Sequence, residues 1–191
     1  MAYNVPLVTQ NNISFGPAKV LIGTYVSGSA CTPAVDVGAL SEDGVNIEVT
    51  SEKRYINQGN PLSAVYAFST TQGVKVSFTS LQWSFDRFID ALGAGNTVAG
   101  SGSDVSFKWG GDPLVTSVAM HMQHFMAQSG NTMNVYVWKS YSDMGLTIPF
   151  GQEEHAFEMS FTAANATVGW DGSTALAVTN ELIEFYRHVT P

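Results

Sequence analysis

Apolar residues alternate with polar ones along five segments of this chain, and this two-residue period strongly limits how the chain can fold. Successive side chains of a β-strand point to opposite faces, so each segment predicts a strand with one buried and one exposed face. Strands of this kind belong to antiparallel sheets that are covered on one side. The five segments are 45–50, 74–79, 105–109, 133–137 and 157–162.

The segment Ser84–Leu92 has a helical period instead. Ser84 suits the N-cap because its hydroxyl can accept a backbone hydrogen bond, and Gly93 tolerates the left-handed backbone that ends many helices. The predicted helix has about two turns, so it needs its apolar side packed on a sheet to be stable. That side contains residues three and four apart, namely Phe85, Phe88, Ile89 and Leu92.

Strands on both sides of one short helix predict a mainly β protein of the α+β type, an antiparallel β-sandwich or barrel with one flanking α-helix. The segment 114–126 is less regular and predicts another strand, while 175–189 fits either a helix or a strand. Helices do not alternate with strands, which excludes a doubly wound fold. The 191 residues predict a single domain, 1–191.

Composition excludes several functional classes. Hydrophobic residues make up 45% of the chain and charged residues 13%, which argues against intrinsic disorder. The net charge of −8 argues against a conventional nucleic-acid binder, which needs cations to neutralise phosphates. A single cysteine, Cys31, forms no internal disulfide, and neither a signal peptide nor a membrane-length apolar run is evident. We therefore expect a protein made in the cytoplasm.

Histidines and glutamates form the most suggestive cluster for chemistry. His121 and His124 are followed by Glu153, Glu154 and His155. On a strand, however, residues three apart face opposite ways, so His121 and His124 do not converge on a metal ion. Nothing around Cys31 indicates a reactive thiol, and no nucleophile elbow or phosphate-binding loop is present. We expect no catalytic, cofactor-binding or metal-binding residues, and no enzyme.

The order of elements carries a resemblance to a known family. An early strand occupies 16–23, and the strand 44–50 runs into a long excursion, 51–64, that contains Gly59-Asn60-Pro61. A strand over 73–81 then leads directly into the helix, which ends Ala91-Leu92-Gly93. In this order of elements the chain resembles the tail tube (major tail) proteins of long-tailed bacteriophages, which share a fold with type VI secretion tube proteins.

The resemblance implies a structural virion protein. Such subunits form a homo-oligomer, in which hexameric rings stack into a hollow viral tail tube through which DNA passes during ejection. The implied partners are the tail tip and tail terminator proteins, and in the lumen the tape measure protein followed by genomic DNA without specific binding. Neither a membrane nor a cofactor is implied.

A tube lining must not hold DNA, because attraction at many phosphates adds up. The polar sides of the predicted strands suit such a lining, although an ordinary solvated sheet face is the alternative. Lys75 and Lys108 depart from this uncharged or acidic character. The candidate lumen-facing residues are Asn46, Glu48, Thr50, Glu52, Ser77, Thr79, Glu158, Ser160 and Thr162.

The excursion over 51–64 is expected to be a long loop. In the family the corresponding excursion contacts the neighbouring ring, which makes Lys53, Arg54 and Tyr55 candidates for an inter-ring contact. A mobile loop tip is the alternative. The ends of the chain, Met1–Thr9 and His188–Pro191, are expected to be flexible and to order on assembly.

Two other functions fit parts of the sequence. A monomeric β-sandwich that binds carbohydrate would use exposed tryptophans as stacking platforms, from among Trp83, Trp109, Trp138 and Trp170. A metal-dependent enzyme would use His121, His124 or His155 as ligands. The first requires exposed indole rings, and the second requires imidazoles that converge.

Overall fold

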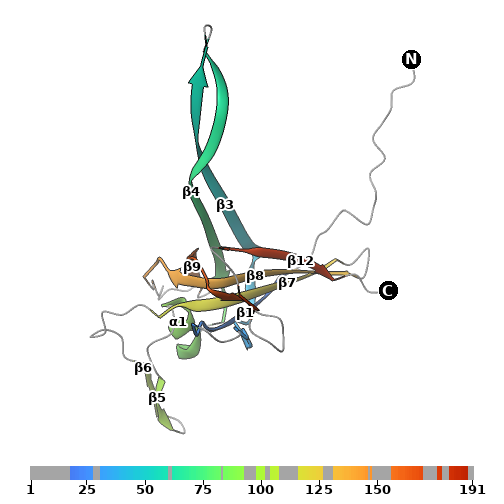
Figure 1. The fold of residues 1–191 in the computed structure, drawn as a ribbon. Coiled ribbons are helices and arrows are strands. Elements are labelled where there is room, and N and C mark those ends of the chain that lie inside the picture. Colours follow the sequence, from blue (N-terminus) through green and yellow to red (C-terminus); the bar gives the residue numbers. More distant parts are fainter. Residues whose placement is uncertain are drawn as a thin grey trace.

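The structure is a computed structural model, and its described part is mainly antiparallel β-sheet with one short helix, as predicted (Figure 1). The described residues are 18–27, 31–59, 62–82, 84–92, 98–101, 104–107, 116–126, 131–145, 147, 156–169, 176–177 and 181–188. The expected flexible ends lie outside them, apart from His188, which ends the last strand.

All five alternating segments fall in strands as far as they are described, and 114–126 is a strand from Val118 onward. In the C-terminal segment 175–189, the described residues 176–177 and 184–188 are in strands rather than in a helix. The strands are β1 (Ala18–Thr24), β2 (Val35–Asp36), β3 (Leu40–Gln58), β4 (Ser63–Ser80), β5 (Val98–Ser101), β6 (Asp104–Phe107), β7 (Val118–Met126), β8 (Asn131–Ser142), β9 (Phe157–Ala163), β10 (Val168–Gly169), β11 (Leu176–Ala177) and β12 (Glu184–His188). The helix is α1 (Phe85–Ala91).

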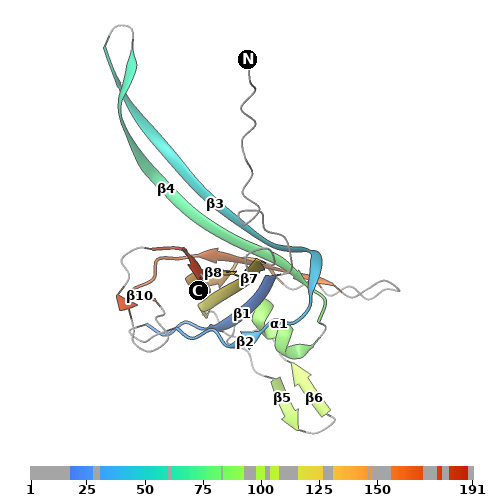
Figure 2. The same cartoon turned by 90° about the vertical axis from the view of Figure 1, so that its right-hand side faces the viewer.

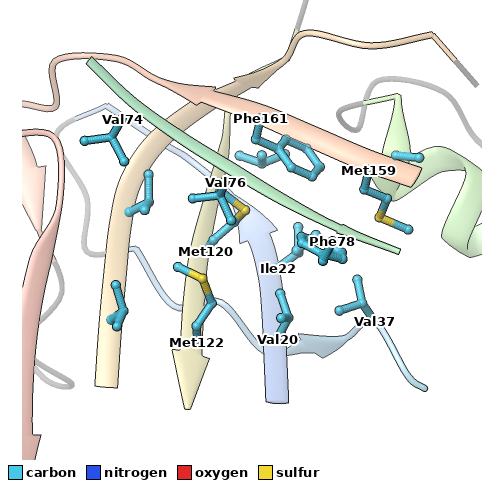
Figure 3. Packing of buried hydrophobic residues seen from close by; sticks show 14 of the residues in the cluster. Val20, Ile22, Val37, Val74, Val76, Phe78, Met120, Met122, Met159 and Phe161 are labelled. Atoms are coloured by element: carbon cyan, nitrogen blue, oxygen red, sulfur yellow. The ribbon is translucent and has the colours of Figure 1, made fainter. Parts of the chain in front are cut away.

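Eight strands form one sheet in the order β2-β1-β7-β8-β9-β4-β3, and β12 pairs with β8. Strand β8 divides the sheet, because residues 132–136 pair with β12 whereas residues 140–142 pair with β9. The sheet thereby separates into two layers that face each other (Figure 3). One layer contains β1, β7 and β8, and the other contains β9, β4 and the first half of β3.

The core lies between these layers. Val20, Ile22 and Met120 from the first layer meet Val76, Phe78 and Phe161 from the second (Figure 3). The rings of Phe78 and Phe161 stack with their centroids 6.1 Å apart. Burying each such side chain contributes about 1.5–3 kcal/mol, so this layer contact is the main source of stability among the described residues.

Helix α1 closes one end of the sandwich. Ser84 is its N-cap, as predicted, and the Ser84 hydroxyl accepts a hydrogen bond from the Arg87 amide at 3.4 Å. Phe88 is buried, and its ring lies edge-on to Phe157 with 5.3 Å between centroids. The expected apolar side is only partly correct, because Phe85 is 37% exposed whereas Arg87 is buried.

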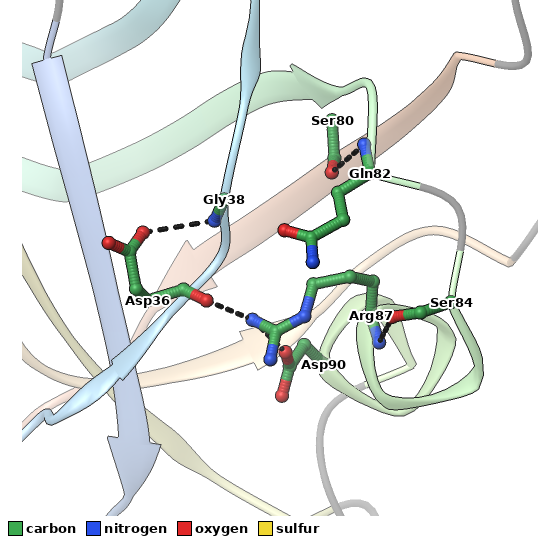
Figure 4. A network of polar contacts seen from close by, with 7 residues as sticks. All are labelled: Asp36, Gly38, Ser80, Gln82, Ser84, Arg87 and Asp90. Atoms are coloured by element: carbon green, nitrogen blue, oxygen red, sulfur yellow. Dashed lines mark hydrogen bonds and ion pairs between the residues drawn. The ribbon is translucent and has the colours of Figure 1, made fainter.

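Arg87 is buried because it ties the helix to strand β2 (Figure 4). Its guanidinium donates to the Asp36 carbonyl oxygen and lies 2.9 Å from the Asp90 carboxylate. The amide of Gly38 donates to the Asp36 carboxylate at 2.9 Å, and this bond holds the pKa of Asp36 below its usual value despite partial burial. The contacts fix the segment that leads into β3.

Strands β3 and β4 pair along almost their whole length, over 19 and 18 residues. The segment 51–64, expected to be a long loop, is instead the far end of this β-hairpin in its described residues. The register shifts between Glu52 and Lys53 and again between Ile56 and Asn57. Both extra residues, Thr70 and Val65, belong to β4, so the bulges leave the spacing on β3 unchanged. Every described residue of 51–64 is exposed, and without a buried face the apolar and polar residues do not alternate, which explains why the pattern predicted no strand here.

Candidate functional site: a projecting hairpin and a polar sheet face

The far half of the β3–β4 hairpin, residues 50–72, leaves the sandwich and stands away from it (Figure 2). We call it the arm. Every described residue of the arm is exposed. Its large apolar side chains are exposed by 38–74%: Tyr55, Ile56, Leu62, Val65, Tyr66 and Phe68. A hairpin of two strands is only marginally stable in water, so an arm of this composition suits burial against another surface.

The two faces of the arm differ in chemistry. Ile56 pairs with Tyr66 and Arg54 pairs with Phe68, so these four residues share one face. The Tyr66 and Phe68 rings lie 6.3 Å apart. We call this the aromatic face. Lys53 and Tyr55 pair with Ser69 and Ala67 and take the other face, so the predicted contact residues divide between the two.

The candidate lumen residues come together on one face of strands β3, β4 and β9. Cross-strand register aligns Asn46 with Ser77 and Ser160, and Thr79 with Glu158. Glu48 and Thr162 flank Lys75 in the next row, while Thr50 and Glu52 continue the same face onto the arm. Most of these side chains are exposed or half-buried.

Ser160 is the exception, because it is fully buried and presents no surface to a lumen. The chain that follows β8 passes here, and the Asp143 amide donates to the Ser160 carbonyl oxygen at 3.1 Å. The role predicted for Ser160 is therefore corrected. Its position in the alternating pattern is right, but a segment distant in sequence covers it.

Lys75 lies on this face, and its charge is paired. Its ammonium lies 3.2 Å from the carboxylate of Asp143, which also accepts a hydrogen bond from Thr162 at 2.9 Å. Burial alone would raise the pKa of Asp143, but the hydrogen bonds and the Lys75 charge hold it below its usual value. The other cation noted in the sequence, Lys108, lies outside the described residues.

The histidines of β7 lie on opposite faces, as predicted for a strand. His121 is buried, stacks on Tyr136 at 4.3 Å and hydrogen-bonds Asn134 at 2.9 Å, and burial lowers its pKa. His124 pairs with Met133. Within the described ranges, no three His, Cys, Asp or Glu side chains gather as a metal site would require. Glu153, Glu154 and His155 lie outside those ranges.

A second buried cluster, which the sequence pattern did not reveal, covers the outer face of β7 and β8. Trp138 is 1% exposed and stacks on Tyr136 with 5.0 Å between ring centroids. Cys31 is buried in the same cluster, and burial raises the pKa of its thiol. Trp138 is thus no platform for a ligand, and Trp83, Trp109 and Trp170 lie outside the described residues.

No known protein family matches this sequence, and no curated protein is detectably similar to it. Within the described part of the chain, no helix has the length and apolar character needed to cross a membrane. The arm and the polar face of β3, β4 and β9 are the two candidate functional surfaces of the described chain.

Proposed function

We propose that this chain is a structural subunit that assembles with copies of itself into hexameric rings, and that the rings stack into the hollow tail tube of a bacteriophage virion. The arm is the observation that carries the proposal. It holds Ile56, Tyr66 and Phe68 in an exposed hairpin that the described chain does not cover. The order of elements resembles that of tail tube proteins, and this resemblance is the reason for proposing stacked hexameric rings as the form of the assembly.

The edges of the sheet support lateral association. Strand β3 is last in the strand order, so one side of it has no neighbour among the described strands. Its unpaired backbone groups are suited to pairing with a strand of the next copy. Joining such edges around a ring produces a closed barrel that has no edges left. This would explain how a sheet with a long exposed edge avoids uncontrolled aggregation.

The polar face of β3, β4 and β9 suits the proposed lumen. Glu48, Glu52 and Glu158 are exposed there, and the charge of Lys75 is paired with Asp143. Hydroxyl and carboxylate groups hydrate a passing duplex without binding its phosphates. In this proposal the tape measure protein and then genomic DNA occupy the lumen, and the tail tip and terminator proteins cap the two ends.

Negative-stain electron microscopy of the purified protein across a range of concentrations tests the proposal. We expect rings or hollow tubes. The Lys53→Glu/Arg54→Glu double variant should block tube growth while its melting temperature stays that of the wild type, because both side chains are exposed. The matched Lys53→Arg/Arg54→Lys variant keeps both charges and should still assemble. A dispersed 20.5 kDa monomer at every concentration would contradict the proposal.

A further inference from the structure

The two layers of the sandwich part at one end and leave a groove of about 800 Å³ between them. Strand β3 supplies one wall of the groove, and β7 and β8 supply the other. Met133 on the second wall is 37% exposed, so the groove presents apolar surface to its surroundings. The apolar residues of the two walls are Leu40, Val45, Ile47, Met122, Met133 and Val135.

An acidic bulge lies at the mouth of this groove. Between the pairs Leu40–Ser80 and Val45–Phe78 the register shifts, because four residues of β3 lie opposite one residue of β4. Gly44 has a φ of +69°, a left-handed conformation that glycine adopts without strain. The bulge carries Glu42 and Asp43, which line the groove and are both exposed. The groove is therefore apolar inside and negatively charged at its mouth.

The arm offers the complementary chemistry. Its aromatic face combines Tyr66 and Phe68 with the cation Arg54. Lys53 is ten positions after Asp43 on β3, and a strand advances about 3.3 Å per residue. The aromatic face and the groove thus lie at opposite ends of one hairpin. The aromatic face of a copy therefore reaches a groove only on another copy.

We propose that the aromatic face of one copy docks in the groove of the next, with Tyr66 and Phe68 against the apolar walls and Arg54 beside Glu42 and Asp43. This inference rests on the proposed self-assembly and names the surface that receives the arm. The contact joins two different surfaces, so it can repeat from copy to copy, and where it joins one ring to the next it extends the tube in one direction. Charge complementarity sets the direction in which copies join.

A charge exchange tests the contact. The Arg54→Glu variant and the Glu42→Arg/Asp43→Arg variant should each fail to form tubes, because like charges then meet at the groove. A mixture of the two should assemble, since the acidic arm of the first variant fits the basic groove of the second. The arm of the second variant keeps Arg54 and fits the acidic groove of the first, as in the wild type. Sedimentation and electron microscopy would report this. The Lys53→Glu variant makes the same charge change on the opposite face and should have a smaller effect.

Disulfide trapping tests the same contact without requiring tubes. Copies carrying Tyr66→Cys are mixed with copies carrying Met133→Cys under mild oxidation. We expect a disulfide-linked dimer, with a yield at least tenfold higher than in the matched mixture of Tyr55→Cys with Met133→Cys. The control yield should be low because Tyr55 lies on the other face of the arm. Cys31 is 1% exposed and should not compete.

The outcomes separate the two proposals. If the wild type forms tubes but Tyr66→Cys traps no better than Tyr55→Cys and the mixture does not assemble, the arm docks elsewhere. In that case the inference fails and the tube proposal stands. If the wild type remains a monomer at every concentration, the tube proposal fails and the docking inference fails with it. Trapping together with assembly of the mixture supports both.

Discussion

The ammonium of Lys75 on β4 lies 3.2 Å from the carboxylate of Asp143, which follows β8, and this ion pair removes a positive charge from the polar face. Thr162 on β9 donates to the same carboxylate at 2.9 Å. The segment after β8 is thereby attached to both β4 and β9. The pair thus has a structural role as well as an electrostatic one.

Replacing Asp143 with Asn should lower the free energy of unfolding at neutral pH by about 1 kcal/mol or less, because both partners are partly exposed. The pKa of Asp143 in the folded protein lies below its ordinary value of 3.8. The stability that this carboxylate adds is therefore complete above 3.8 and is lost as the pH falls through the folded pKa. Urea unfolding over a pH series should show the difference between wild type and variant shrinking in acid. A difference that stayed constant with pH would exclude the ionised pair as its source.

Reversing the acidic charges of the polar face should create DNA affinity. We expect assembled wild-type protein not to retain duplex DNA in a co-sedimentation assay. The Glu48→Lys/Glu158→Lys variant should retain it, and the retention should fall steeply as salt is raised, because bound phosphates release counterions. A Glu181→Lys/Glu184→Lys variant makes the same charge change on β12 and the residues before it, and serves as the control. Equal retention by both variants would argue against a lumen at the first face.

Phe88 should be the residue of α1 that matters most for stability. The Phe88→Ala change removes a buried ring from its contact with Phe157 and should cost about 3–5 kcal/mol. Phe85 is 37% exposed, so Phe85→Ala should cost clearly less. Chemical unfolding followed by circular dichroism measures both. Equal losses would show that the helix does not pack as described.

His121 should make the fold sensitive to mild acid. Burial places its folded pKa below the ordinary value of 6.5, so the unfolded chain binds the proton more readily. Stability should therefore fall as the pH drops through 6.5 toward the folded pKa, by at most about 1.4 kcal/mol per pH unit for one group. In the His121→Gln variant, this part of the change in unfolding free energy with pH should disappear. Unfolding measured at several pH values would refute the prediction if both proteins had equal slopes.

Sequence patterning predicted the strands well where one face of a strand is buried. Val74, Val76 and Phe78 alternate with polar residues because only one side of β4 meets the core there. The helix was also predictable, since the N-cap at Ser84 and the spacing of Phe88 are local features. Neither inference depends on knowing which strands are neighbours.

Features that depend on distant segments could not be predicted. Ser160 has the spacing of an exposed residue, yet the segment after β8 buries it. Strand β8 has both faces buried around Tyr136 and Trp138, so the polarity of its residues does not report a second cluster. The strand structure of the arm was missed because its described residues are exposed on both faces, so apolar and polar residues do not alternate. A stretch rich in Val, Tyr and Phe, such as 65–68, was a signal of strand structure that could have been used.

The chain order of the hairpin and the groove has a consequence for synthesis. Strands β3 and β4 are adjacent in sequence, so their hairpin can form soon after both leave the ribosome, whereas β1 must wait for β7. One wall of the groove consists of the same β7 together with β8, and both are translated after the hairpin. A nascent chain therefore forms its arm before its own groove is complete. If the arm docks in this groove as proposed, a new copy can receive the arm of another only after its β8 has been translated.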